Sequence, residues 1–168
     1  MAITKVVPQD YTTEESLRGL LSYVLTSEKC ISGLCNWFSL YKGTPEYYCD
    51  QFLGVQKTYN KTEGNKLFHL VISIWKYSCL TAEDVYSLGY NIYCHLPQDH
   101  QIVYAVHEDT YNLHLHFLIN SISYYSGKRL IVDRDFIYNI KLFADDTEQR
   151  LTKRRIDIIK KEQKELER

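Results

Sequence analysis

The sequence predicts an α+β domain in which helices pack on a central, mainly antiparallel sheet. Segments with β-branched or alternating apolar residues, typical of strands, are separated by segments that begin with a threonine cap and continue with helical spacing. Their order along the chain is strand, helix, helix, strand, helix, strand, strand, hairpin return, helix. This order favours antiparallel pairing, and we expect the helices to gather on one face of the sheet. A chain of 168 residues is long enough for one domain with its own core.

The amino-terminal third contains two predicted strands and two predicted helices. Residues 3–7 are a β-branched run closed by a proline, which predicts a first strand. Residues 12–15, Thr-Thr-Glu-Glu, resemble a capping box and begin a helix. Tyr23 is on the last turn of that helix, at the edge of its apolar stripe. A short strand is expected at 36–40, and the sequence Thr-Pro-Glu begins a helix over 44–60.

The middle of the chain has the most apolar segments. Residues 67–75 form a nearly continuous apolar run, as expected of a central strand. Thr81 begins a third helix with acidic residues in its first turn, ending near residues 96–97. Two further strands are predicted at 102–107 and 113–120, joined by a polar segment of hairpin length.

The carboxyl-terminal part begins with a predicted hairpin return over 121–131, followed by a helix that Asp133 caps. Residues 147–168 are highly charged. We expect one domain over 1–146 and a charged carboxyl-terminal helix over 147–168, which packs thinly, meets a partner or leads into a longer chain.

Composition excludes several classes of protein. No run of eighteen apolar residues is present, and the first residues lack the apolar core of a signal peptide, so we expect a soluble cytoplasmic protein without membrane contact. The five cysteines are scattered without a Cys-x-x-Cys pair, which indicates reduced thiols. A net charge of −1 argues against nucleic-acid binding through bulk electrostatics, although the 15 tyrosines offer faces on which bases can stack. Oligomeric state cannot be predicted.

Three histidines are predicted to share one small site. His114 and His116 are two residues apart in an alternating strand, so both imidazoles lie on one face. The hairpin brings His107 close to His114. Neutral imidazole is the commonest metal ligand in proteins, and three of them leave coordination positions open for a substrate or water. Asp109 is placed where a carboxylate could fix a histidine tautomer.

The same segment resembles a known family. The block His107-Glu-Asp-Thr-Tyr-Asn-Leu-His-Leu-His116, with Asn120 after it, is similar to the histidine motif of the relaxase/mobilisation nucleases of conjugative plasmids and integrative elements, in the P-type mobilisation class of the HUH endonuclease superfamily. The helix ending Tyr23-Val-Leu-Thr-Ser-Glu-Lys29 resembles the tyrosine signature of that class. Further matches are Gln51-Phe-Leu, His69-Leu-Val-Ile-Ser73 and Gly127-Lys128. The resemblance spans about residues 2–145, and it departs after Ser73, where Ile74-Trp75-Lys76 replaces a phenylalanine and a glycine-bearing turn.

The resemblance implies site- and strand-specific nicking of single-stranded transfer-origin DNA in the bacterial cytoplasm. Tyr23 would attack the scissile phosphate, leaving a 5′-phosphotyrosine and a free 3′ hydroxyl, and the reverse step would rejoin the strand. His107, His114 and His116 would hold Mn²⁺ or Mg²⁺, with Zn²⁺ or another transition ion as an alternative. Three imidazoles favour manganese, zinc or other transition ions over magnesium. Accessory relaxosome proteins and coupling proteins would be partners.

Further residues have expected roles at this site. Asp109 would steady a histidine or help to take the tyrosine proton. Asn120 and Ser73 would contact DNA or close hydrogen bonds at strand ends. Tyr111 would stack on bases, and Lys128 and Arg129 would contact phosphate nearby. His69, inside an apolar strand, is expected to be structural.

Two other functions stay open at the level of sequence. The first is a three-histidine metal hydrolase that acts through activated water, with Tyr23 only structural. The second is a relaxase-like module that binds DNA without cutting it.

Overall fold

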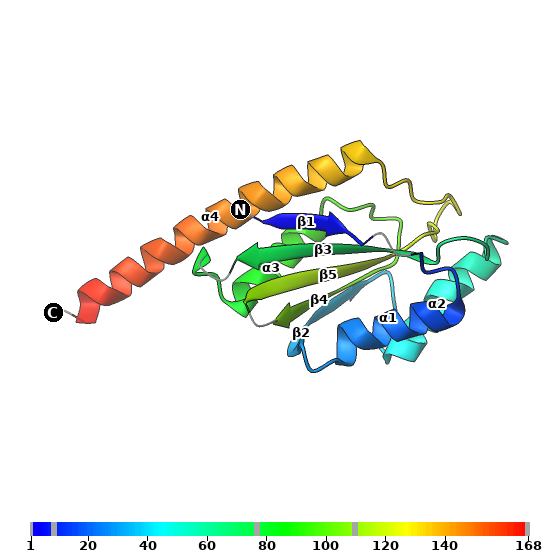
Figure 1. Ribbon diagram of the computed structural model, residues 1–168, viewed down its shortest axis with the longest axis horizontal. Coiled ribbons are helices and arrows are strands. Elements are labelled where there is room, and N and C mark those ends of the chain that lie inside the picture. Colours follow the sequence, from blue (N-terminus) through cyan, green and yellow to red (C-terminus); the bar gives the residue numbers. More distant parts are fainter. Residues whose placement is uncertain (1, 8–9, 76–77, 109–110, 167–168) are drawn as a thin grey trace.

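A five-stranded antiparallel sheet forms the centre of the molecule (Figure 1). The computed structural model describes residues 2–7, 10–75, 78–108 and 111–166. Along the sheet the strand order is β1-β3-β5-β4-β2, and each pair of neighbours is antiparallel. The predicted α+β class is confirmed.

The strands are β1 (Ile3–Val6), β2 (Cys30–Phe38), β3 (Leu67–Trp75), β4 (Ile102–Glu108) and β5 (Asn112–Asn120). β5 lies at the centre, between β3 and β4. β2 begins six residues earlier than the sequence predicts. Its pairing with β4 shifts register between residues 30 and 35, around a glycine at φ +80°, and this irregularity interrupts the alternation that marks a strand.

The helices are α1 (Glu14–Thr26), α2 (Pro45–Thr58), α3 (Ala82–Tyr93) and α4 (Arg134–Leu166). Threonine side chains cap the first three by accepting a backbone N–H of the first turn. The predicted capping box of α1 is displaced by one residue, because Thr13 and Ser16 form it.

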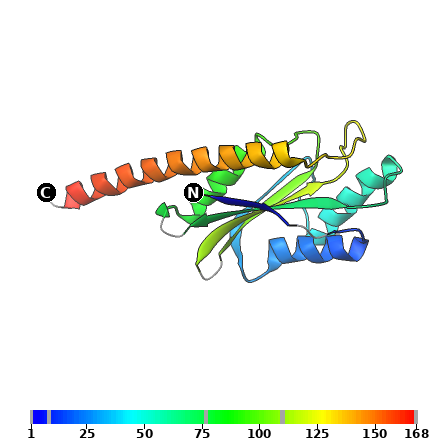
Figure 2. The ribbon, with the colours of Figure 1, turned by 45° about the horizontal axis from the view of Figure 1, so that its top comes forward.

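Helices cover both faces of the sheet, so the expectation of helices on one face is wrong (Figure 2). α1 and α2 pack on one face through a cluster that includes Val103, Ala105 and Leu118. α3 and α4 pack on the other face, over a larger cluster that includes Tyr104 and Phe117. Since β4 is buried at all but its last position and β5 is buried from Leu115 onward, both faces of the sheet require a cover here.

α4 is one helix of 33 residues that runs without a break past residue 147. Its buried residues lie between Ile140 and Glu148, and the rest of the helix extends beyond the sheet (Figure 1). The predicted hairpin return over 121–131 is reduced to one isolated bridge, between Ile122 and Arg129. No helix in the described part of the chain is both long and apolar enough to cross a membrane.

Candidate active site

Strand register brings the predicted histidines together at one end of the sheet. His107 of β4 lies opposite His114 of β5, and Ser73 of β3 lies opposite His114 on its other side. Residues directly opposite one another point to the same face, so these three side chains form a row across the sheet. His116 lies on the same face, one row further in, opposite Ala105. This is the face that α1 covers.

Tyr23 lies beside this row. The centroid of its ring is 5.4 Å from that of His107 and 6.1 Å from that of His116, and the rings of His107 and His116 are 4.3 Å apart. Tyr23 keeps 42% of its surface exposed. The end of α1 is tied to the sheet because Nε2–H of His107 donates to the carbonyl of Val24 at 2.7 Å. A phenol from α1 and imidazoles from β4 and β5 therefore meet at a surface that solvent reaches.

The cluster contains a fourth imidazole, that of His69, which the sequence predicted only as a structural residue. His69 Nε2 lies 2.9 Å from His116 Nδ1, and the two rings stack with centroids 5.2 Å apart. His69 precedes Ser73 by four residues and so shares its face of β3. Only the register of β3 with β5, which the sequence does not reveal, places it beside His116.

The buried imidazoles are neutral at neutral pH. Desolvation lowers the pKa of His69 to about 4 and that of His116 to about 2, with further lowering from neighbouring imidazoles. Desolvation also lowers the pKa of His107. A neutral imidazole has one nitrogen lone pair, which is the form that binds a metal ion.

These residues fit a divalent cation. Nδ1 of His107 is buried and has no hydrogen-bond partner among the described residues, so its lone pair is available. A tetrahedral ion with metal–nitrogen bonds of about 2.1 Å holds the ring centroids of two imidazole ligands about 5.3 Å apart. The rings of His107 and His116, at 4.3 Å, are within this distance, whereas those of His114 and His116, at 6.2 Å, would have to approach each other. Within the described ranges no three ligand side chains already converge on one point, so a bound ion would need small ring rotations. A nitrogen donor set favours manganese or zinc over magnesium.

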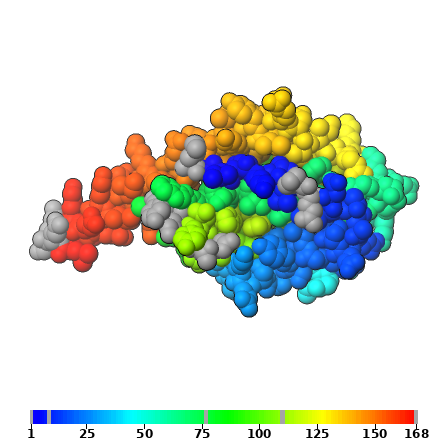
Figure 3. Space-filling view, in the orientation of Figure 1, coloured from blue at the N-terminus to red at the C-terminus, as the bar shows by residue number. Residues whose placement is uncertain are grey.

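Residues beside the row can contact a nucleic acid. Tyr111 is 68% exposed and immediately precedes β5, at the histidine end of the sheet. Ser73 is half-buried in the row itself. Lys29 is exposed, and its charge acts on both His107 and His116. Figure 3 shows β1 at the surface between α4 and α1, so this edge of the sheet is exposed.

Lys128 and Arg129 lie away from the histidines, and their contact with phosphate stays a prediction. They follow Asn120, which ends β5 six residues from His114, or about 20 Å at the rise of an extended strand. The Arg129 guanidinium donates to two backbone carbonyls, those of Glu63 and Asn65, and so ties a loop at the opposite end of the sheet.

Asn120 was expected either to contact DNA or to close hydrogen bonds at a strand end, and the structure shows the second role. Its side chain is fully buried and its amide is hydrogen-bonded to Phe52, Gln56 and Gln101, so it presents no surface to DNA. Asp109 lies outside the described residues, and its role stays a prediction.

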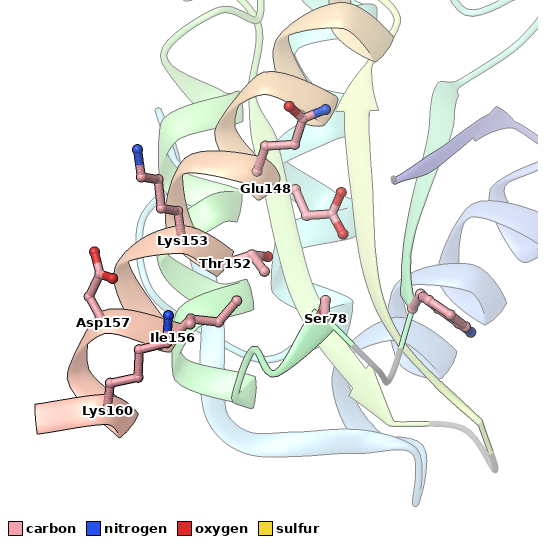
Figure 4. A pocket seen from close by; sticks show the side chains of 9 residues that line it. Ser78, Glu148, Thr152, Lys153, Ile156, Asp157 and Lys160 are labelled. Atoms are coloured by element: carbon pink, nitrogen blue, oxygen red, sulfur yellow. The ribbon is translucent and has the colours of Figure 1, made fainter. Parts of the chain in front are cut away.

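A separate hollow of about 490 Å³ lies beside α4 (Figure 4). Its walls include Ser78, Thr152, Ile156 and Lys160. None of the histidines lines it, so it is not part of the cluster around Tyr23.

Comparison with known proteins agrees with this geometry. Residues 23–152 match the family model described as "Relaxase: MobA/VirD2-like, nuclease domain". Protein rlx of Staphylococcus aureus is 30% identical over 101 residues, which are 60% of this chain and 30% of that protein. Protein TraI of Escherichia coli is 28% identical over 123 residues, which are 71% of this chain and 16% of that protein. The chain thus spans less than a third of either relative.

Proposed function

We propose that this chain, which belongs to the MobA/VirD2-like family of relaxase nucleases, nicks one strand of transfer-origin DNA through Tyr23. The observation that supports this most directly is the place of Tyr23, exposed on the last turn of α1 with its ring 5.4 Å from His107 and 6.1 Å from His116. We further propose that the substrate is single-stranded, that the enzyme acts in the bacterial cytoplasm, and that accessory relaxosome and coupling proteins are its partners.

In the proposed reaction a bond forms between the Tyr23 hydroxyl oxygen and phosphorus, while the bond between phosphorus and the 3′ oxygen breaks. The phenol loses its proton to a base, for which Asp109 is the candidate, and the 3′ oxygen leaves as a hydroxyl once protonated. A phenol with an ordinary pKa near 10 is a weak nucleophile at neutral pH, so it needs nearby positive charge. Lys29 would supply part of that charge. His107, His114 and His116 would hold a divalent cation, which would polarise the phosphate oxygens.

The test is covalent trapping. Wild-type protein and Tyr23→Phe are incubated with Mn²⁺ and single-stranded oligonucleotides that tile the DNA next to the encoding gene, and protein–DNA adducts are resolved on a denaturing gel. We expect an adduct with wild type and none with Tyr23→Phe. The control is Tyr138→Phe, an exposed tyrosine on α4, which should form as much adduct as wild type.

Other outcomes identify the alternatives. Equal adduct from Tyr23→Phe would show that Tyr23 is not the nucleophile. Cleavage without an adduct would indicate a hydrolase that uses activated water. Binding without cleavage would indicate a DNA-binding module.

A further inference from the structure

A buried chain of hydrogen bonds leads away from the site, through His116 and His69 to Tyr11. His116 Nδ1 and His69 Nε2 are 2.9 Å apart, and His69 Nδ1 lies 3.2 Å from the Tyr11 hydroxyl. All three side chains are less than 10% exposed. The backbone of Tyr11 is itself held, since its carbonyl accepts from the N–H of Lys66 at 2.8 Å. The chain thus joins β5, β3 and the segment before α1.

The two facing ring nitrogens can share only one hydrogen, and its position decides what His116 can bind. If His69 Nε2 carries it, His116 carries its own hydrogen on Nε2 and has no lone pair outside the chain. If His116 Nδ1 carries it, His69 carries its hydrogen on Nδ1 and donates it to the Tyr11 hydroxyl oxygen. In this second arrangement Nε2 of His116 keeps a lone pair.

We propose that His69 and Tyr11 are positioning residues, which hold His116 in the tautomer whose Nε2 can bind a divalent cation. The inference rests on the proposed function, since it concerns the same cation. A hydrogen bond to the far nitrogen of a ligand histidine fixes both its tautomer and the orientation of its ring. His69 supplies that acceptor, and the Tyr11 hydroxyl, which can accept as well as donate, is placed to take the hydrogen from His69 Nδ1.

Burial limits the hydrogen-bond partners that the ring nitrogens of His69 and His116 can have. Water does not compete for the nitrogen atoms between His69 and His116, so each can be satisfied only by the other ring. An apolar residue at position 69 would fill the same space opposite Leu118 but would leave Nδ1 of His116 without a partner. His116 would then be free to rotate or to exchange tautomers.

The direct test reads the tautomer. The full chain is labelled with ¹⁵N-histidine, and long-range proton–nitrogen correlation spectra are recorded without metal at neutral pH, with His116→Ala used for assignment. We expect His116 to carry its hydrogen on Nδ1. A hydrogen on Nε2 would overturn the proposal, and this measurement does not depend on the stability of any position-69 variant.

The second test measures Mn²⁺ affinity by isothermal titration calorimetry, again without DNA. Loss of such an outer partner weakens metal binding about 10- to 100-fold, so we expect that loss in His69→Phe and a smaller one in Tyr11→Phe. His69→Gln, whose amide oxygen can still accept from Nδ1, should restore part of the affinity. The matched control is His95→Phe, since His95 stacks on Phe143 on the α4 side of the molecule, and its affinity should equal that of wild type.

The possible failures are distinguishable. Wild-type affinity in a folded His69→Phe would overturn the positioning role and leave the proposed nicking intact. A wild-type chain that binds no Mn²⁺ would overturn the positioning role together with the cation in the proposed mechanism. Adduct formation by Tyr23 would then decide the nicking reaction separately.

Discussion

Asn120 joins several elements through one side-chain amide. Its Nδ2 donates to the carbonyl of Phe52 in α2 at 3.1 Å and to Oε1 of Gln101 at 2.8 Å. Its Oδ1 accepts from Nε2 of Gln56 at 2.9 Å. All of these groups are buried, so removing the amide would leave several polar atoms without a hydrogen-bond partner and without access to water. Each buried polar group left unsatisfied lowers the stability of the folded state by about 1–3 kcal/mol.

We therefore expect Asn120→Ala to lower the free energy of unfolding by roughly 2–4 kcal/mol, measured by urea titration. The control is Asn91→Ala, whose exposed amide donates only within its own helix, to the carbonyl of Ser87. It should change stability by less than about 0.5 kcal/mol. If Asn120→Ala proved fully stable but bound single-stranded DNA more weakly, the residue would belong to the DNA contact instead.

At the scale of the element, α3 approaches the sheet through a glycine. A Cβ atom at Gly89 would lie 2.7 Å from Cε2 of Tyr104 and 2.9 Å from Cδ2 of Leu115. Both side chains are fully buried, and the hydroxyl of Tyr104 donates to the carbonyl of Tyr86. The ring of Tyr104 cannot move aside without losing that bond, so the helix itself would have to move.

Gly89→Ala should therefore destabilise the protein by about 1–3 kcal/mol, although alanine is the better helix former. Gly54 provides the matched control, since it lies exposed in α2 and a Cβ there would meet nothing within 4 Å. Gly54→Ala should raise stability by up to about 1 kcal/mol. Thermal melting of both variants measures the difference, and a stabilising Gly89→Ala would show that α3 does not pack this closely.

The elements also show how much the sequence could predict. Alternation over two residues was enough to place His114 and His116 on one face, and the short polar connection was enough to bring His107 beside them. Both inferences use only local geometry. The relation of His69 to His116 depends on β3 pairing with β5, which brings together two residues 47 positions apart, and no local pattern records such a contact.

Contacts between distant parts of the chain also explain where the structure departs from the predictions. Lys128 and Arg129 follow β5 closely in sequence, but a strand of nine residues carries the chain to the opposite end of the sheet. The prediction that helices pack on one face was wrong, because β4 and the second half of β5 are buried on both faces of the sheet. The roles of individual imidazole nitrogens depend on partners such as the carbonyl of Val24, whose position only the folded chain defines.

At the scale of the whole molecule, charge is unevenly divided. Residues 1–133, which include the sheet and the histidine site, contain ten Lys and Arg against thirteen Asp and Glu. Residues 134–166 of α4 contain nine Lys and Arg against seven Asp and Glu, and the outer half of that helix extends past the sheet (Figure 1). A strand of DNA at Tyr23 would therefore meet few cations, and Lys29 is one of them.

This distribution predicts a shallow dependence of DNA affinity on salt. Each phosphate neutralised on a single strand contributes about 0.7 to the slope of log affinity against log salt, so we expect a slope magnitude below about 3. Fluorescence anisotropy with a labelled single-stranded oligonucleotide measures it in a Tyr23→Phe background, where no covalent adduct forms. Lys29→Gln should reduce the slope by about 0.7. The double charge reversal Lys161→Glu/Lys164→Glu, at exposed positions on the outer half of α4, should leave the slope unchanged. A steep slope that this double variant abolishes would place the DNA along α4 rather than across the sheet at Tyr23.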